Sequence, residues 1–475
     1  MDNKGVNAVK KENFSEWYTQ VIQKADLIDY SEVSGCLIFK PGSYSIWENI
    51  QSYLDGKFKK DGVKNAYFPL LIPEHLFKKE AEHVQGFAPE VAWVTHAGNT
   101  KLNERLAIRP TSETIMYDSY AKWIRSWKDL PLRYNQWCNV IRWEFKHPVP
   151  FLRTREFLWQ EGHSVFATKK EADKEAIRIL NFYADCYEKI LAVPVLKGIK
   201  SKNEKFAGAD YSLSVETLLP NGKAIQGATS HNLGQNFSKA FGIKFLDISE
   251  KNDYGWQNSW GFSTRSIGIM IAIHGDDKGI ILPPNVVLNK VVVVPILFTK
   301  DKKEIVNVAN SIVKKLKKFN PLLDDRDDYS AGWKFNEWEM KGIPLRIEIG
   351  PKDLASKQVV FVRRDNNEKI NVKIKDIGKE VPKVLNEIQE NLFLKAKKFL
   401  EGSIQKVQDI SELKKVVNDN GIGKANWCGS PSCEENVKDK TGAKSLNSEF
   451  NSKAEGKCFA CNAKAEYVTY FGKSY

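Results

Sequence analysis

Short strand-like runs separated by tight turns dominate the middle of the chain and constrain its fold most strongly. Alternating or aromatic-rich runs occur at residues 133–145, 156–166, 211–216, 223–233 and 257–262. Little helical pattern intervenes between residues 205 and 265, so these strands lack the crossover helices that parallel pairing requires. We therefore predict a mainly antiparallel sheet. Neither GxGxxG nor GxxxxGK[ST] occurs, which argues against a parallel nucleotide-binding sheet.

Helical patterns precede this sheet. Apolar residues recur at three- or four-residue spacing from Phe14 to Ala25 and again from Tyr44 to Leu54, and each stripe predicts a helix with one buried face. Residues 35–39 and 66–72 read as strands. Pro69 falls inside the second run, and because a proline cannot donate to a sheet ladder, that strand belongs at an edge or where another segment arrives.

The pattern changes after Pro283 and Pro284 to an alternation of strands and helices, which indicates an α/β unit. A long amphipathic helix from Glu380 to about Leu400 closes this unit. The chain of 475 residues is 42% hydrophobic, enough for two or three packed domains. We predict an α+β protein with domains at residues 1–285, 286–400 and 401–475, the last one small and α/β.

Charge and targeting signals limit the classes of function. The net charge of +13 favours a polyanionic partner such as nucleic acid, although a basic surface without a special role is the simpler alternative. The first residues lack the apolar core of a secretory signal, and no apolar run is long enough to cross a bilayer. We expect a soluble, cytoplasmic protein without a membrane partner.

One predicted hairpin combines cations with aromatic rings. Arg142 and Glu144 lie two apart in a strand-like run, so we expect them on the same face of the sheet. A basic loop follows, and the returning run brings Arg153 and, four residues later, Phe157. Guanidinium groups bind phosphates and aromatic rings stack on bases, so this hairpin is suited to a nucleotide.

This pattern resembles motif 2 of the class II aminoacyl-tRNA synthetases. The helix that ends near Lys60 and the run that carries Pro69 resemble motif 1, which forms the dimer interface in that class. Residues 258–268 resemble motif 3, a strand that leads into a helix with an arginine, here Arg265, in its first turn. Thr264 stands where the class usually has an acidic residue, a variant that proline enzymes tolerate.

Three further patterns resemble prolyl-tRNA synthetases in particular. They are Arg109-Pro-Thr111-Ser-Glu113, Trp159-Gln-Glu161-Gly-His163 and Gln226-Gly-Ala-Thr229-Ser-His231. Threonine, serine, glycine and histidine enzymes share the scaffold. The threonine family, however, places a zinc-ligating cysteine near Thr111, and serine enzymes carry a long N-terminal helical hairpin that has no counterpart here. The stretch between motifs 2 and 3 leaves no room for the large editing insertion of the bacterial type.

The resemblance implies ATP-dependent activation of L-proline and transfer of the prolyl group to tRNA(Pro), with Mg²⁺ entering with ATP and Glu216 as a possible ligand. The implied catalytic cations are Arg142 and Arg265. The implied ATP-binding residues are Arg142, Glu144, Arg153, Thr154, Phe157, Gln226, Thr229, Ser263 and Arg265. The implied proline-binding residues are Thr111, Glu113, Arg142, Trp159, Glu161, His163, Phe206 and His231.

Each of these residues also has an ordinary structural explanation, as a surface ion pair, a hydrogen-bonded histidine or a core aromatic ring. Their occurrence together, in the order and spacing of three motifs, favours the enzyme. Two other functions stay open at this point. One is a regulatory RNA-binding relative without activity, and the other is an ATP ligase that forms adenylate but charges no tRNA.

The α/β unit resembles the anticodon-binding domain of this subclass. Glu339, Arg346 and Lys352 match positions that would read the guanines of a proline anticodon, because Arg and Lys donate to guanine O6 and N7 and a carboxylate accepts from its N–H groups. Ordinary surface ion pairs are the alternative.

Four cysteines in two close pairs lie near the end of the chain: Cys428, Cys433, Cys458 and Cys461. This arrangement is typical of a closed, structural Zn²⁺ site with four thiolates. Free or oxidised thiols are the alternative. A tail of this kind resembles that of the archaeal and eukaryotic type of prolyl-tRNA synthetase.

Overall fold

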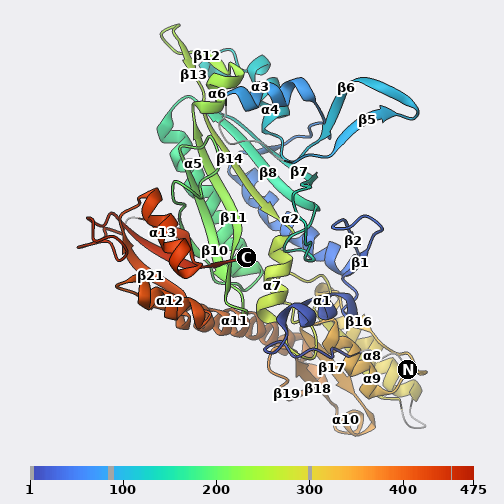
Figure 1. Ribbon diagram of the computed structural model, residues 1–475. Coiled ribbons are helices and arrows are strands. Elements are labelled where there is room, and N and C mark those ends of the chain that lie inside the picture. Colours follow the sequence, from blue (N-terminus) through green and yellow to red (C-terminus); the bar gives the residue numbers. More distant parts are fainter. Residues whose placement is uncertain (1–4, 84–89, 298–301, 451) are drawn as a thin grey trace.

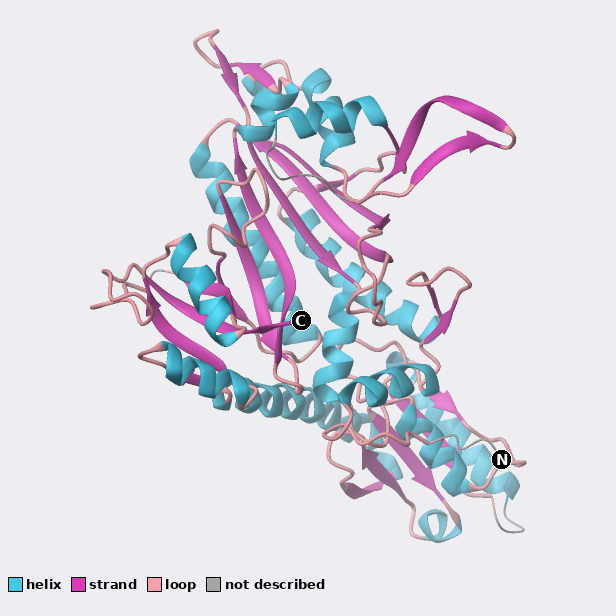
Figure 2. Cartoon of the chain, in the orientation of Figure 1, coloured by secondary structure: helices cyan, strands magenta, loops and turns pink. Residues whose placement is uncertain are grey.

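The computed structural model describes residues 5–83, 90–297, 302–450 and 452–475. Helices and strands are mixed along the whole chain (Figures 1 and 2), as the sequence predicts for an α+β protein. A long twisted sheet occupies the centre, a smaller α/β unit lies below it, and the C-terminal unit lies at its side (Figure 1).

The central sheet has eleven strands, and its middle is antiparallel as predicted. In spatial order the strands are β20 (Ile404–Lys406), β21 (Ile422–Trp427), β23 (Tyr467–Ser474), β22 (Lys444–Glu449), β9 (Leu196–Ile199), β10 (Tyr211–Leu218), β11 (Lys223–Gly234), β14 (Trp256–Ser263), β8 (Glu156–Phe166), β7 (Leu132–Ile141) and β3 (Lys64–Asn65). Five of them (β10, β11, β14, β8 and β7) match the runs recognised in the sequence, with small differences at their ends.

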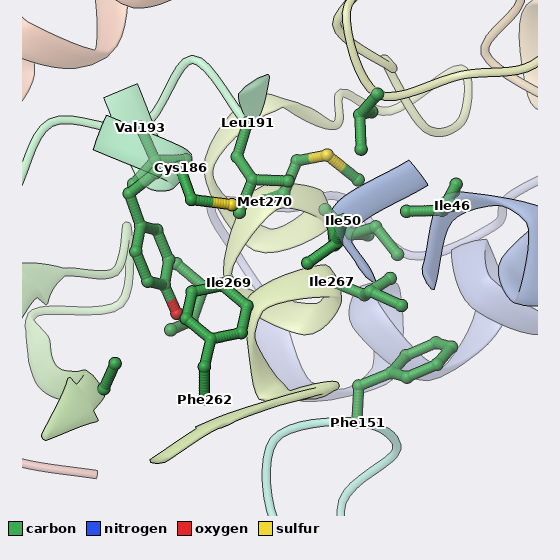
Figure 3. Packing of buried hydrophobic residues seen from close by; sticks show 14 of the residues in the cluster. Ile46, Ile50, Phe151, Cys186, Leu191, Val193, Phe262, Ile267, Ile269 and Met270 are labelled. Atoms are coloured by element: carbon green, nitrogen blue, oxygen red, sulfur yellow. The ribbon is translucent and has the colours of Figure 1, made fainter. Parts of the chain in front are cut away.

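Helices cover one face of this sheet and form the main core with it. They are α1 (Phe14–Lys24), α2 (Pro41–Lys60), α5 (Lys169–Asp185), continued by a π-helical turn (Cys186–Ile190), and α7 (Arg265–His274). Figure 3 shows α7 at the centre of this packing: Ile267 lies on the side of Phe151 and α2, Ile269 lies on the opposite side near Phe262, and Met270 lies near the segment that follows α5. Burial on all sides fixes α7, which carries Arg265 at its first position.

The predicted single strand at residues 66–72 is wrong. Residues 66–70 form no strand, and they connect β3 to β4 (Leu71–Pro73), which belongs to a different, three-stranded sheet with β5 (Trp93–Ala97) and β6 (Thr100–Ile108). Side chains replace the missing ladder: the Phe68 N–H donates to Gln136, and Arg109 Nη1 donates to the Phe68 carbonyl at 2.8 Å. Pro69 therefore sits in a connection between sheets, where its missing N–H costs nothing.

Helices α3 (Glu74–His83), α4 (Glu113–Trp123) and α6 (Asn236–Phe241) and the hairpin of β12 (Lys244–Leu246) and β13 (Asn252–Tyr254) lie at the upper end of the sheet (Figure 1). A short hairpin of β1 (Ile28–Tyr30) and β2 (Leu37–Phe39) follows α1. The second of these strands was predicted, at residues 35–39.

The α/β unit contains a five-stranded sheet in the order β16 (Leu322–Leu323), β15 (Val291–Pro295), β17 (Leu345–Ile349), β18 (Gln358–Arg363) and β19 (Lys369–Lys373). Its helices are α8 (Lys302–Lys315), α9 (Ala331–Met340), α10 (Pro351–Ala355) and the first part of α11 (Ile377–Gly402). Three short 3-10 helices complete the chain's elements, at Trp127–Asp129, Lys317–Phe319 and Ile374–Asp376. The long closing helix predicted for this unit corresponds to α11, which starts three residues earlier than predicted.

The C-terminal unit has its own small core around Trp427, with helices α12 (Ile410–Asn418) and α13 (Pro431–Thr441). Its strands nevertheless continue the central sheet, because β22 pairs with β9 and the end of β23 pairs with β11. The sequence predicted a separate unit and gave no sign of this shared sheet. Within the described residues, no helix is both long and apolar enough to cross a membrane.

Candidate active site

A cavity of about 270 Å³ opens on the central sheet, and most of the predicted site residues line it. Those residues are Thr111, Glu113, Arg142, Phe157, Trp159, Glu161, His163, Phe206, Gln226, Thr229, His231, Ser263 and Arg265. The first and last of these residues, Thr111 and Arg265, are more than 150 positions apart in the sequence. The fold therefore brings together the two predicted groups, one for a nucleotide and one for an amino acid.

Strand alternation explains how the floor of the cavity forms. Residues two apart on a strand share a face, so β8 presents Phe157, Trp159, Glu161 and His163 on one side. Across the sheet, Gly261 of β14 pairs with Glu161. Because Gly261 has no side chain and the cavity reaches it, space remains above the strand at this point.

A tryptophan explains the glycine between Glu161 and His163. A Cβ atom on Gly162 would lie 2.1 Å from the ring of Trp260, which is buried against the opposite face of the sheet. Any side chain at position 162 would displace Trp260 and with it the strand that carries the two polar residues. The spacing of the Trp159-to-His163 pattern is thus set by packing on both faces.

Two partly buried arginines line the cavity. Arg142 Nε donates to the Pro110 carbonyl at 3.1 Å, and its guanidinium lies 5.5 Å from the ring centre of Phe157. Arg265 Nε donates to the Leu152 carbonyl at 3.0 Å. Burial lowers the pKa of both guanidinium groups, although both stay charged. Among the described residues neither has a carboxylate within 4 Å, so both cations are available to an anion.

Two buried carboxylates line the same cavity. Thr111 Oγ1 donates to Glu113, and Ser112 donates to Glu161 through its hydroxyl and through its N–H, the latter at 3.0 Å. His163 Nε2 lies 3.3 Å from Glu161 Oε2, and its Nδ1 lies 3.0 Å from the Tyr117 hydroxyl. Neither carboxylate is more than 4% exposed.

The pKa values of Glu161 and His163 follow from these contacts. Burial alone would raise the pKa of Glu161, but the hydrogen bonds from His163 and Ser112 outweigh burial and lower it. Burial alone would lower the pKa of His163, but the hydrogen bond to Glu161 and the charges of Glu113 and Glu161 raise it. The lowered pKa favours the ionised form of Glu161, which suits a cationic amine.

A third wall is aromatic and neutral. The rings of Phe206 and His231 stack with centres 4.8 Å apart, and His231 Nδ1 lies 2.7 Å from the Ser212 hydroxyl. Burial, followed by the charges of His163, Lys200 and Arg142, lowers the pKa of His231 to about 3. His231 is therefore uncharged near neutral pH, and the wall fits an apolar ring.

Three predicted ATP-binding residues do not line this cavity. Glu144 was expected on the same strand face as Arg142, but β7 ends at Ile141, and Glu144 is exposed in the turn that follows. The prediction of a shared strand face is wrong because the Arg142 N–H makes the last hydrogen bond to the returning chain, at Arg155. Thr154 is buried nearby, and Arg153 lines an adjoining cavity together with Gln226 and Arg265.

Sequence patterns missed several residues that line the cavity, among them Lys200, Glu204, Ser212 and Ser259. Ser259 could have been found, because it lies on β14 two residues before Gly261. Lys200 and Glu204 belong to no recognised motif, and only the course of the loop between β9 and β10 brings them here.

In the α/β unit the structure brings two of the three predicted anticodon residues together. Arg346 Nη1 lies 3.5 Å from Glu339 Oε1, and the Arg346 guanidinium lies over the Phe335 ring at 4.5 Å. Glu339 Oε2 also lies 3.6 Å from Lys278 Nζ. Lys352 is exposed on α10 and does not line either of the two cavities that Glu339 lines.

The four C-terminal cysteines converge. Their sulfur atoms all lie within 4.8 Å of one another, with Cys428 and Cys461 at 3.6 Å and Cys433 and Cys458 at 3.8 Å. A tetrahedron of sulfurs about 2.3 Å from a central Zn²⁺ has edges of about 3.8 Å. The spacing of these thiols therefore fits such an ion.

Comparison with known proteins bears directly on these sites. The tRNA synthetase class II core domain (G, H, P, S and T) matches residues 94–274, an anticodon binding domain matches residues 290–384, and the C-terminal domain of prolyl-tRNA synthetase matches residues 410–475. A proline--tRNA ligase of Alkaliphilus oremlandii is 50% identical over 466 residues, which cover 98% of this chain and 96% of the relative. The chain belongs to the prolyl-tRNA synthetase family.

Two other prolyl-tRNA synthetases are similar to this chain over nearly its full length. The cytoplasmic proline--tRNA ligase of Arabidopsis thaliana is 48% identical, covering 99% of this chain and 91% of the relative. The crystal structure of prolyl-tRNA synthetase from Cryptosporidium parvum, complexed with halofuginone and AMPPNP, superposes with a TM-score of 0.95 at 47% identity, covering 99% and 100% of the two chains. The predictions of a class II core, an anticodon-binding domain and a proline--tRNA ligase are confirmed.

Proposed function

We propose that the central cavity binds L-proline and ATP side by side, and that this prolyl-tRNA synthetase charges tRNA(Pro) through prolyl-adenylate. The observation that carries the proposal is that one cavity holds cations, carboxylates and aromatic rings together. The partly buried Arg142 and Arg265, the buried Glu113 and Glu161, and an aromatic wall all line it. Such a cavity suits a zwitterionic amino acid whose carboxylate points toward a polyphosphate.

Arg142 would bridge the proline carboxylate and the α-phosphate, because a guanidinium fork can hold two anions at once. Attack of the carboxylate oxygen on the α-phosphorus releases pyrophosphate. Arg265 would stabilise the charge that develops on the outer phosphates, and Arg153 would do so from the adjoining cavity. Phe157 would stack on adenine, and Gln226, Thr229 and Ser263 would contact the nucleotide.

Glu113 and Thr111 would accept hydrogen bonds from the secondary ammonium group of proline. Glu161, fixed by Ser112 and His163, would add a second negative charge near this group. Trp159, Phe206 and His231 would enclose the pyrrolidine ring. Their rigid aromatic walls provide the contact that a small, largely apolar ring can make.

The direct test is proline-dependent exchange of pyrophosphate into ATP, followed by charging of tRNA(Pro) transcripts with labelled proline. We expect both activities in the zinc-loaded protein. Exchange without charging would favour an ATP ligase of another kind, and the absence of both would favour a regulatory relative. Threonine, serine and alanine in place of proline measure the selectivity of the pocket.

Mg²⁺ would enter with ATP, and it would neutralise phosphate charge there. Glu216 lines the adjoining cavity together with Arg153 and is the candidate carboxylate ligand of this ion. In the structure it pairs with Lys200 at 3.1 Å. Competition between Mg²⁺ and Lys200 for this carboxylate would then accompany nucleotide binding.

Glu339 and Arg346 would read guanines of the anticodon, and Lys352 would join them from α10. The proximity of Glu339 and Arg346 supports this role, because together they offer the acceptor and the donors that a guanine edge needs. The exposed position of Lys352 suits contact with a phosphate or base that approaches from solvent.

The cysteine cluster would hold a structural Zn²⁺ through Cys428, Cys433, Cys458 and Cys461. An N–H donor, that of Ala460, points at the Cys458 sulfur at 3.5 Å and would favour its thiolate form. With all four positions filled by protein sulfur, the ion would stabilise the C-terminal unit and take no part in the reaction.

Dimerisation through the motif 1 region and a cytoplasmic location complete the proposal. Strand β3 lies at the end of the central sheet, and the neighbouring Tyr67 is 72% exposed, which is unusual for so large a ring. The cytoplasmic relative from Arabidopsis supports the location. The domain limits at 285 and 400 stay part of the proposal, with the shared sheet joining the first and third domains.

A further inference from the structure

The loop at residues 200–210, between β9 and β10, forms part of the cavity wall. Lys200, Glu204 and Phe206 all line the cavity, and Phe206 stacks on His231 in the proposed proline pocket. The backbone N–H of Phe206 donates to Ser212 Oγ at 2.9 Å, and the same hydroxyl contacts His231. The position of this loop therefore sets the shape of the pocket.

The first half of the loop is attached to the C-terminal unit. Four contacts join them: Lys200 Nζ donates to the Leu446 carbonyl at 2.9 Å, Ser201 Oγ to Glu434 Oε1 at 2.8 Å, Asn203 Nδ2 to the Pro431 carbonyl at 3.4 Å, and Lys444 Nζ to Glu204 Oε1 at 3.1 Å. These contacts all come within six residues before Phe206. Figure 1 shows the C-terminal unit beside β10, and its strand β22 pairs with β9, which leads directly into the loop.

Glu434 is the least ordinary member of this set. It is 6% exposed, and one of its oxygens accepts from both Ser201 and Ser445. Its other oxygen, Oε2, is buried without a hydrogen-bond partner among the described residues. A half-satisfied buried carboxylate is unfavourable for folding, so stability alone does not explain it.

The neighbours of Glu434 connect it to the cysteine cluster. It directly follows Cys433, in the first turn of α13, and Cys433 lies 3.8 Å from Cys458 in the cluster. Whatever closes the cluster also fixes this turn. Ser201, at the other end of the contact, is itself buried and stands five residues before Phe206.

We propose that Glu434 is a positioning residue for the proline pocket, through which the C-terminal cysteine unit holds the 200–210 loop in its binding conformation. The proposal rests on the assignment of the cavity to proline. Glu434 touches no substrate. It acts through Ser201 on the loop that carries Phe206, so its loss changes the affinity for proline more than the rate of chemistry.

The test compares Glu434→Ala, Ser201→Ala and the double variant in pyrophosphate exchange. Loss of a hydrogen bond to a charged group corresponds to a roughly 10-fold or larger rise in the KM for proline. We expect such a rise with little change in kcat or in the KM for ATP. The double variant should resemble either single one, because both remove the same contact. Glu434→Gln keeps the acceptor oxygen and should restore a near-normal KM.

Hydrogen exchange of residues 200–210 supplies a readout that needs no substrate. Glu434→Ala should speed exchange in this loop, whereas Glu435→Ala, a change at the exposed neighbour on α13, should not. Unchanged loop exchange and an unchanged KM in Glu434→Ala and Ser201→Ala would overturn the proposal. A different result would count against the assignment of the pocket to proline and still uphold the positioning contact. In that case the wild-type protein would show no proline-dependent pyrophosphate exchange, whereas Glu434→Ala would still speed hydrogen exchange in the loop.

Discussion

The catalytic cavity and the cysteine cluster are both buried groups of ionisable side chains, but the fold assembles them in opposite ways. The cavity draws on residues from Thr111 to Arg265, and its carboxylates are held by hydroxyl, N–H and imidazole donors of the protein itself. In the cluster, each of the four thiols has another thiol as its nearest ionisable neighbour. The carboxylates of the cavity are therefore held by donors of the protein itself, whereas the proposed Zn²⁺ would hold the four thiols of the cluster together.

The strongest way to break this comparison is to remove the proposed zinc. Structural zinc sites contribute on the order of 10 kcal/mol to the folding of small domains. We expect chelation to expose the segment at residues 410–475 to protease, and added zinc to restore its protection. The pairing of β22 with β9 will limit the damage to the central sheet.

Cys433→Ser should imitate chelation, and Cys36→Ser serves as the matched control because Cys36 lies outside the cluster. Protease resistance that is identical with and without chelator would show that the cluster is stable as free thiols. Like the catalytic cavity, the cysteine cluster would then be held by the protein's own contacts.

The second prediction concerns the available cations of the cavity. Arg142→Ala should lower the rate of pyrophosphate exchange by more than about 100-fold, corresponding to roughly 3 kcal/mol of lost transition-state stabilisation. The midpoint of unfolding should stay near that of the wild type, because Arg142 makes no salt bridge within the described part of the chain. The exposed Arg125→Ala is the control for loss of a charge. Full exchange activity in Arg142→Ala would refute the central assignment.

Features that depend on local sequence could be predicted in both regions, whereas features that depend on contacts between distant segments could not. Trp159, Glu161 and His163, which the sequence pattern assigned to one site, lie on one face of β8 because alternation requires only a strand, and the convergence of the cysteine pairs needed only their spacing. Glu144 was misplaced because the end of β7 depends on a backbone contact to Arg155. Lys200 and the sharing of the sheet by β22 and β23 were missed because both depend on how the C-terminal unit docks, which no local pattern encodes.

The third prediction tests whether Glu161 is held by its hydrogen-bond partner His163. The lowered pKa of Glu161 contributes stability above its ordinary value of 4.5, and this contribution is lost as the pH falls through the lowered pKa. The raised pKa of His163 contributes stability below its ordinary value of 6.5, and this is lost as the pH rises through the raised pKa.

Glu161→Gln should therefore cost most between pH 4.5 and 6.5, by about 1.5–3 kcal/mol, and less on either side. Urea unfolding of both proteins across the acid and neutral range measures this difference. A cost that does not depend on pH would mean that His163 and Glu161 are coupled only by packing.

The smallest effect is expected at a pair that lies between the two extremes. Glu339 is half-buried, and it meets Arg346 and Lys278 at 3.5 and 3.6 Å, distances too long for strong ion pairs. Glu339→Gln removes an anionic acceptor from the proposed guanine site, and we expect kcat/KM for charging to fall by about 5- to 10-fold, corresponding to about 1 kcal/mol.

Pyrophosphate exchange in the absence of tRNA should be unchanged, because the cavity is organised by its own contacts. Transcripts with a changed anticodon base provide the control: if Glu339→Gln loses the same factor with these as with the normal transcript, Glu339 reads no base, and the pair is an ordinary surface contact.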